Sequence, residues 1–133
     1  MSNWSHVAAV IKIDNLRFNP NVKPNFDELI GKEVNPDDDA EIWNDARKHP
    51  DKYLPMSNGG SLKKSIYEDS DINRKAAYTI RIFGVLRNHD DPDEIIKWFK
   101  NKMKIWKKKF KIRQMTVTVH DEQNGTRNYT PKL

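Results

Sequence analysis

The sequence of 133 residues predicts an α+β fold built on one antiparallel sheet. Apolar and polar residues alternate, as in strands with one buried face, over three stretches: residues 6–14, 62–67 and 112–120. Residues 76–86 indicate a further strand, and residues 93–110 carry apolar side chains at helical spacing. A hairpin turn at Asn124-Gly125 adds a last strand. With helical segments after the first strand, this order predicts a ferredoxin-like βαββαβ sandwich with an extra C-terminal β-hairpin edge strand.

The long helix over residues 93–110 is the element against which we expect the core to form. Its apolar side chains recur at intervals of three and four residues and share one face: Ile96, Phe99, Met103, Trp106 and Phe110. Asp91 is expected to cap this helix, with Pro92 in its first turn. The same capping role accounts for the acidic residues beside His89, which has no neighbouring histidine for a metal site.

The first half of the chain is expected to hold two short helices after its strand. Residues 24–30 predict one helix, which Gly31 ends. Asn35 is expected to cap a second helix that ends near Lys48. Three aspartates at 37–39 suit the positive end of that helix, and their spacing lacks the alternating oxygen ligands of a calcium loop.

Residues 53–61 are the most loop-like part of the chain, because paired glycines permit unusual backbone angles. Gly59, Gly60 and Ser61 precede a strand, whereas a phosphate-binding P-loop leads into a helix. The segment is therefore either a structural loop or a loop that contacts a ligand.

The composition restricts the class of protein. Lys and Arg number 24 against 19 Asp and Glu, a net charge of +5. One folded domain over residues 1–133 is expected from this length. The lack of cysteine excludes disulfides and thiolate chemistry. No apolar run matches a membrane span or a signal peptide, so we expect a cytoplasmic protein without a membrane partner.

No arrangement of residues in the sequence predicts catalysis. His6 and His120 can meet on the exposed sheet face if their strands are neighbours, and paired imidazoles can act in phosphoester chemistry. Neither histidine lies in the His-x-Thr/Ser motif of the two-histidine phosphoesterases. We therefore expect a protein that is not an enzyme and that uses no cofactor and no metal.

The exposed face of the sheet is the first candidate ligand site. Cationic, hydroxyl and aromatic side chains at its outward positions suit a phosphate-bearing ligand such as a nucleotide signal. With the glycine segment, the candidates are Lys12, Gly59, Gly60, Ser61, Lys63, Tyr67, Thr79, Arg81, Thr116, Thr118 and His120. Apolar residues on this face would equally suit a homo-oligomer, namely Ala8, Ala77 and Phe83.

The lysine-rich helix is the second candidate, as a nucleic-acid surface. Its cations would make salt-dependent, sequence-independent phosphate contacts, and Trp98 could stack on a base. The residues are Lys97, Trp98, Lys100, Lys104, Lys107, Lys108 and Lys111. A solvated face is the simpler interpretation, because arginine, which is preferred for bidentate phosphate contacts, is scarce there.

Five segments carry a resemblance: KHPDKYLPM at 48–56, GSL at 60–62, IFGVLR at 82–87, DDPDEII at 90–96 and IRQ at 112–114. Together they resemble a family of small uncharacterised bacteriophage and prophage proteins of low-GC gut bacteria, over most of the chain. Asn58 stands where an acidic residue is expected, and the lysine run is heavier than in the family. The family has no agreed catalytic motif, so the resemblance assigns no functional residue.

The resemblance implies a phage accessory protein that acts in the host cytoplasm. Such small proteins commonly antagonise a host defence by binding a protein or by sequestering a nucleotide signal. We therefore expect non-enzymatic binding of a host protein or a nucleotide. The alternatives are nucleic-acid binding by the lysine-rich helix and a homo-oligomeric structural or assembly role.

Overall fold

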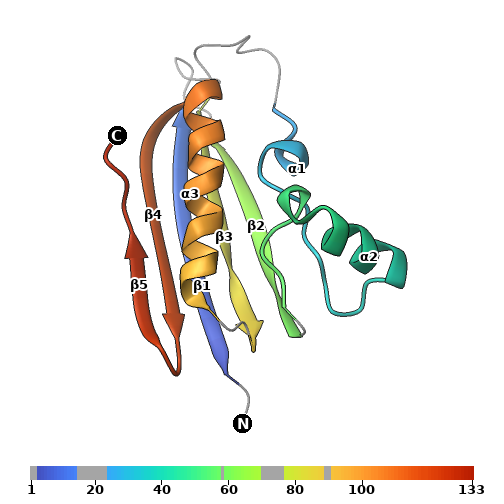
Figure 1. The fold of residues 1–133 in the computed structure, drawn as a ribbon. Helices are drawn as coiled ribbons and strands as arrows, with labels where there is room; N and C mark the ends of the chain where they lie inside the picture. Colours follow the sequence, from blue (N-terminus) through green and yellow to red (C-terminus); the bar gives the residue numbers. More distant parts are fainter. Residues whose placement is uncertain (1–2, 15–23, 58, 70–76, 89–90) are drawn as a thin grey trace.

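The computed structural model describes residues 3–14, 24–57, 59–69, 77–88 and 91–133, and Figure 1 shows how their elements are arranged. These residues contain five strands: β1 Trp4–Asp14, β2 Gly59–Asp69, β3 Ala77–Arg87, β4 Lys111–Asp121 and β5 Gly125–Tyr129. They also contain three α-helices and one 3-10 turn: α1 Phe26–Leu29, α2 Ala40–Lys48, Pro50–Lys52 and α3 Pro92–Lys109. The strands and the long helix expected from periodicity are confirmed.

The strands form one antiparallel sheet in the order β2-β3-β1-β4-β5. β1 lies in the middle and pairs with β3 on one side and β4 on the other. β5 returns alongside β4, which confirms the predicted edge strand. Alternate side chains of β1 are at most 3% exposed: Val7, Ala9, Ile11 and Ile13. One face of the sheet is therefore the wall of the core.

α3 lies across that face and closes the core (Figure 1). The predicted apolar stripe is confirmed, because its side chains are at most 7% exposed: Ile96, Phe99, Met103, Trp106 and Phe110. Asp91 caps α3 as expected and accepts a 2.9 Å hydrogen bond from the Asp93 amide. The Trp106 indole donates a 2.9 Å hydrogen bond to the Leu29 carbonyl, which joins the α1 segment to α3. His89 lies outside the described residues.

The predicted ferredoxin-like βαββαβ sandwich is wrong. In the described residues, five strands and three α-helices follow the order β-α-α-β-β-α-β-β, and the sheet is ordered β2-β3-β1-β4-β5. The short α1 adds Phe26 to the core beside α3. α2 lies beyond β2 (Figure 1), where Ala46, its one buried residue, packs with Val34 and Tyr53 in a separate small cluster. α2 therefore does not pack on the sheet as the second helix of the predicted fold would.

Two local predictions also need correction. Asp39, and not Asn35, caps α2, because its side chain accepts a 3.0 Å hydrogen bond from the Ile42 amide. In the predicted loop over residues 53–61, residues 54–57 have no regular structure, as expected, but Gly59, Gly60 and Ser61 begin β2. Gly60 has a φ of 75°, and a Cβ at that position would overlap the Val85 carbonyl oxygen. Glycine is thus needed there for the close approach of β2 to β3.

Candidate functional site

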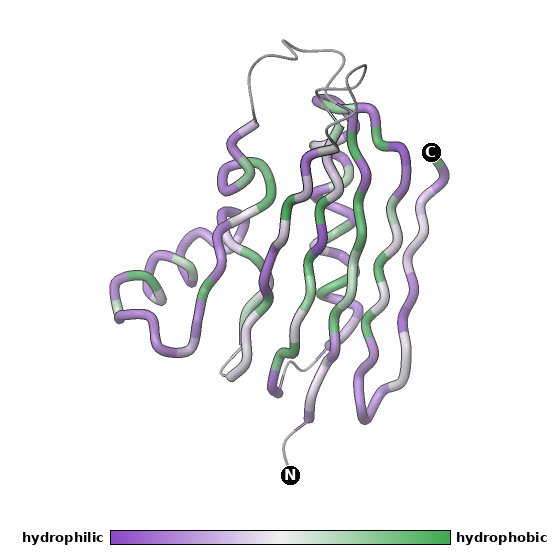
Figure 2. Tube along the Cα trace, turned by 180° about the vertical axis from the view of Figure 1, so that it is seen from behind, coloured by the Kyte–Doolittle hydropathy of each residue, from purple (hydrophilic) through white to green (hydrophobic). Residues whose placement is uncertain are grey.

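The sheet face turned away from α3 carries no described helix, and we call it the open face (Figure 2). The strand register places its side chains in four rows from β2 to β4. The rows are Ser61, Val85, His6, His120; Lys63, Phe83, Ala8, Thr118; Ser65, Arg81, Val10, Thr116; and Tyr67, Thr79, Lys12, Gln114. The structure thus brings the predicted sheet-face residues onto one surface. Gly59 shares this side of β2, whereas Gly60 lies on the α3 side.

Two aromatic side chains project from the open face. Tyr67 is 61% exposed and Phe83 is 45% exposed, although large rings usually bury most of their surface. Arg81 lies between them, two residues from Phe83 in β3 and opposite Ser65 in β2. At a rise of about 3.4 Å per residue, the two rings are offset by about 14 Å along the strands. The open face therefore presents two separate stacking platforms with a guanidinium between them.

Arg81 and Lys12 are two accessible positive groups of the open face. Both side chains are exposed, and neither has a hydrogen-bond or ion-pair partner among the described residues. Lys63 differs, because its ammonium donates to Asn35 at the sheet edge and lies 3.8 Å from Glu33 Oε2. The charge of Lys63 is thus partly balanced. Arg81 and Lys12 are the better groups for a phosphate.

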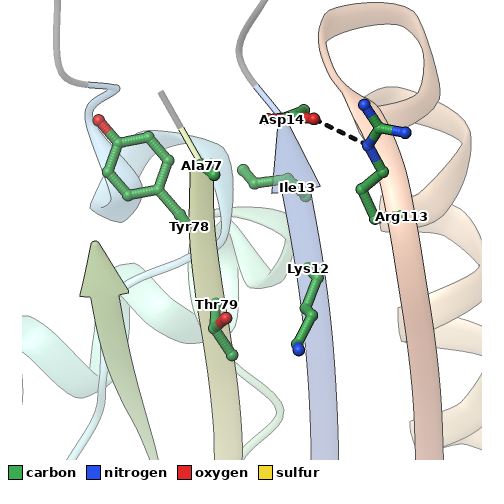
Figure 3. A pocket seen from close by; sticks show the side chains of 7 residues that line it. All are labelled: Lys12, Ile13, Asp14, Ala77, Tyr78, Thr79 and Arg113. Carbon is green, nitrogen blue, oxygen red and sulfur yellow. Dashed lines mark hydrogen bonds and ion pairs between the residues drawn. The ribbon is translucent and has the colours of Figure 1, made fainter. Parts of the chain in front are cut away.

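A hollow of about 230 Å³ adjoins Lys12 at one end of the open face (Figure 3). Its lining residues are Lys12, Ile13, Asp14, Ala77, Tyr78, Thr79 and Arg113. Arg113 Nε donates a 2.8 Å hydrogen bond to Oδ2 of Asp14, which is only 3% exposed. A guanidinium has five N–H donors, so the half-exposed Arg113 keeps donors for a ligand. The Arg113 guanidinium therefore gives the hollow a hydrogen-bond donor for an anionic group, whereas the Lys12 ammonium points away from it along β1 (Figure 3).

Arg113 is absent from the residues predicted for this face. The register of β4 against β1 shifts between Lys12 and Ile13, so β4 carries an irregularity there. The signal in the sequence is the spacing of Ile112 and Met115, which are both buried but three positions apart in an alternating strand. An extra residue of this kind marks a β-bulge, which re-aims a side chain. Here it places Arg113 beside the end of β1.

His6 and His120 face each other across β1 and β4, as proposed for neighbouring strands. Both residues are exposed, and their ring centroids are 6.1 Å apart. His6 Nε2 lies 3.0 Å from Glu122 Oε1, and His120 Nδ1 lies 2.8 Å from Thr126 Oγ1. One nitrogen of each imidazole, His6 Nδ1 and His120 Nε2, has no partner among the described residues.

Asp121 holds the turn between β4 and β5 in place. Its buried carboxylate accepts hydrogen bonds of 2.7 Å from Ser5 Oγ, 2.7 Å from the Asn124 amide and 3.0 Å from the Gln123 amide. Burial alone would raise the pKa of Asp121, but these bonds and one from Asn3 outweigh burial and lower the pKa to about 2. The ionised carboxylate is thus a fixed anchor for this end of the open face.

The lysine surface of α3 lies on the side of the molecule opposite the open face (Figures 1 and 2). It consists of five exposed side chains: Lys97, Lys100, Lys104, Lys107 and Lys108. Lys111 belongs to β4. Trp98 is half-buried, with its ring edge-on to Phe99 at 4.9 Å and the Lys102 ammonium 5.4 Å away. Trp98 is thus packed into the protein and is a poor platform for a base.

Comparisons with protein-family models, with curated proteins and with solved structures found no match. Within the described ranges, no three His, Cys, Asp or Glu side chains gather closely enough to hold a metal ion. No helix in the described part of the chain is long and apolar enough to cross a membrane. The chemistry of the open face is therefore the basis for assigning a function.

Proposed function

We propose that this protein binds a nucleotide ligand on the open face, either as a free nucleotide or as part of a single strand. The observation that supports this most is the position of Arg81 between the exposed rings of Phe83 and Tyr67. Bases of every kind stack on aromatic rings, and guanidinium groups bind phosphate. Unpaired bases expose their faces for stacking, so the surface suits single strands better than duplexes.

The proposed action is occupancy, without chemical change of the ligand. The open face is broad and solvent-exposed, and its aromatic and cationic groups are suited to recognition. A bound nucleotide would be withdrawn from other receptors by mass action. This action agrees with the resemblance to phage accessory proteins, for which the expected role is sequestration of a nucleotide signal in a host cell.

Fluorescence anisotropy with a labelled oligonucleotide of about six nucleotides tests the proposal. We expect the single strand to bind at least about tenfold more tightly than its duplex. Phe83→Ser should weaken binding about tenfold, because stacking of one base is lost. Ile105→Ser is the matched control, since Ile105 is 46% exposed on α3. Equal binding of single strand and duplex, or equal losses in the two variants, would contradict the proposal.

Mass spectrometry of the ligand after incubation tests the absence of turnover. The ligand should be recovered intact. A hydrolysis product that disappears in His6→Ala or His120→Ala would show instead that the paired histidines are catalytic.

A second candidate is a homodimer through the same face. The observation that favours a homodimer is an apolar strip across β1 and β3, formed by Ala8, Val10, Phe83 and Val85. In that case light scattering would show a dimer at high protein concentration, and nucleotide binding would weaken as the dimer forms. A monomer at high concentration would end this candidate.

A further inference from the structure

The His6–His120 pair carries an inference that rests on the proposed nucleotide binding and makes it more specific. We propose that the two imidazoles form the subsite for a terminal phosphate of the ligand, and that the subsite operates when the imidazoles are protonated.

The geometry of the pair supports a shared ligand. The rings lie on neighbouring strands with centroids 6.1 Å apart, and both are exposed, so neither is needed to fill the core. Glu122 and Thr126 each contact one ring nitrogen and thereby set the ring orientations. The remaining nitrogens, His6 Nδ1 and His120 Nε2, have no partner among the described residues. A phosphate between the rings can accept a hydrogen bond from each.

The affinity of the pair for phosphate is proposed to depend on pH, so the charged groups around the two imidazoles matter. Glu122 contacts His6 from the β4–β5 turn, and Arg87 of β3 is opposite Trp4, two residues before His6. Lys63 lies one row further along β2. α3 packs against the other face of the sheet. Two adjacent imidazolium groups repel each other, and an anion between them relieves that repulsion. Protonation and phosphate binding therefore favour each other.

The position of Phe83 connects the subsite with the stacking platform. Phe83 is opposite Ala8, which is two residues from His6 in β1. One strand spacing and two residues of rise separate Phe83 from His6 by about 8 Å. That separation matches the reach from a base to its own phosphate. A base stacked on Phe83 can thus place a terminal phosphate at the histidine pair.

A pair of oligonucleotides that differ only in their 5′ group, phosphate or hydroxyl, tests this inference, each with a label at the 3′ end. At about pH 5.5 we expect the 5′-phosphate form to bind about tenfold more tightly, and near pH 8 the preference should vanish. His6→Gln/His120→Gln should abolish the preference, so that this variant binds the two oligonucleotides equally at both pH values. His49→Gln should retain it, because His49 is an exposed histidine on another part of the chain.

Failure of the subsite and failure of nucleotide binding give different results. Equal binding of both oligonucleotides at both pH values, still dependent on Phe83, would exclude the subsite and leave nucleotide binding in place. Binding of neither would remove the proposed function. In that case, NMR titration with inorganic phosphate decides the subsite by itself. Shifts of the His6 and His120 signals, but not of His49, would support it, and unchanged signals would exclude it.

Discussion

The two sides of the molecule carry positive charge in different ways. The lysine surface gathers five exposed ammonium groups on α3, and its nearby Trp98 is half-buried. The open face has fewer free cations, but it places Arg81 between two exposed rings. Charge alone attracts any anion, whereas charge combined with stacking recognises a base and a phosphate together. The side with the larger charge is therefore not the side with the more specific chemistry.

Even within α3, lysines have different roles. Lys102 is only 8% exposed, and its ammonium donates a 2.6 Å hydrogen bond to the Asp51 carbonyl. Burial lowers the pKa of Lys102. This lysine joins α3 to the 3-10 turn and is not part of the lysine surface. A count of lysines along the helix thus overstates the charge that is available to a partner.

Among the substitutions considered, removal of the Asp121 carboxylate should have the largest effect, and that effect should be on the stability of the β4–β5 turn. Asp121→Ala leaves the donors of the β4–β5 turn without their acceptor, and we expect the free energy of unfolding to fall by about 2–4 kcal/mol. Chemical denaturation measures this loss. Glu122→Ala, in the same turn, should cost less than about 1 kcal/mol, because the partner of the Glu122 side chain among the described residues is the exposed His6.

The same carboxylate should make stability depend on acid. The pKa of Asp121 is about 2 in the folded protein against an ordinary value of 3.8, so its contribution is complete above about pH 4. It is lost as the pH falls toward 2, by about 2 kcal/mol. Asp121→Asn should lack this part of the acid dependence. Parallel acid curves for the variant and the natural chain would contradict the anchor role.

The next largest effect is expected from charge reversal, which should weaken binding on the open face more than on the lysine surface. Arg81→Glu/Lys12→Glu is expected to weaken single-strand binding about thirtyfold, since two phosphate contacts become repulsive. The slope of log affinity against log salt should become shallower by about 1.4. Lys104→Glu/Lys107→Glu changes the net charge equally and serves as the control on α3. Equal losses in both variants would mean that only overall charge matters.

Tyr67→Ala should have a smaller effect that depends on ligand length. Tyr67 lies about 14 Å along the strands from Phe83, so one nucleotide cannot reach both rings. We expect about fivefold weaker binding of a long single strand and unchanged binding of a mononucleotide, measured by calorimetry. Equal effects on both ligands would show that the rings do not bind successive parts of one strand.

Substitutions on the lysine surface should have the smallest effect on single-strand affinity. Lys100→Glu/Lys104→Glu/Lys107→Glu/Lys108→Glu should alter single-strand affinity by less than about threefold at about 0.15 M salt, where distant charges are screened. Filter binding at several salt concentrations measures this. A steep loss of affinity would instead assign nucleic-acid binding to α3.

Period-two alternation predicts most of the strand residues that share the open face. Lys12, Arg81 and Thr116 follow from it, because the apolar residues beside them must face the core. The rows across the sheet required the strand order, which alternation does not contain. The adjacency of Arg81 and Tyr67 depends on β2 pairing with β3.

The remaining errors concern residues whose role depends on distant contacts. α2 has the composition of an ordinary amphipathic helix, but its packing partners, Val34 and Tyr53, belong to its own segment. Nothing local distinguishes such a helix from one that covers a sheet. The glycines at the start of β2 resemble a loop until the Val85 carbonyl is known to lie against Gly60. Arg113 was missed because one extra residue in β4 reverses the alternation.

The described helices cover only one face of the sheet, and this has a consequence for how the sequence can change over generations. In β1 the core uses Val7 and Ala9, whereas Ala8 and Val10 between them lie on the open face. Substitutions at the second set should change the free energy of unfolding little, because the packed layer is untouched. Sequence changes can therefore accumulate on the open face while the packed scaffold stays the same.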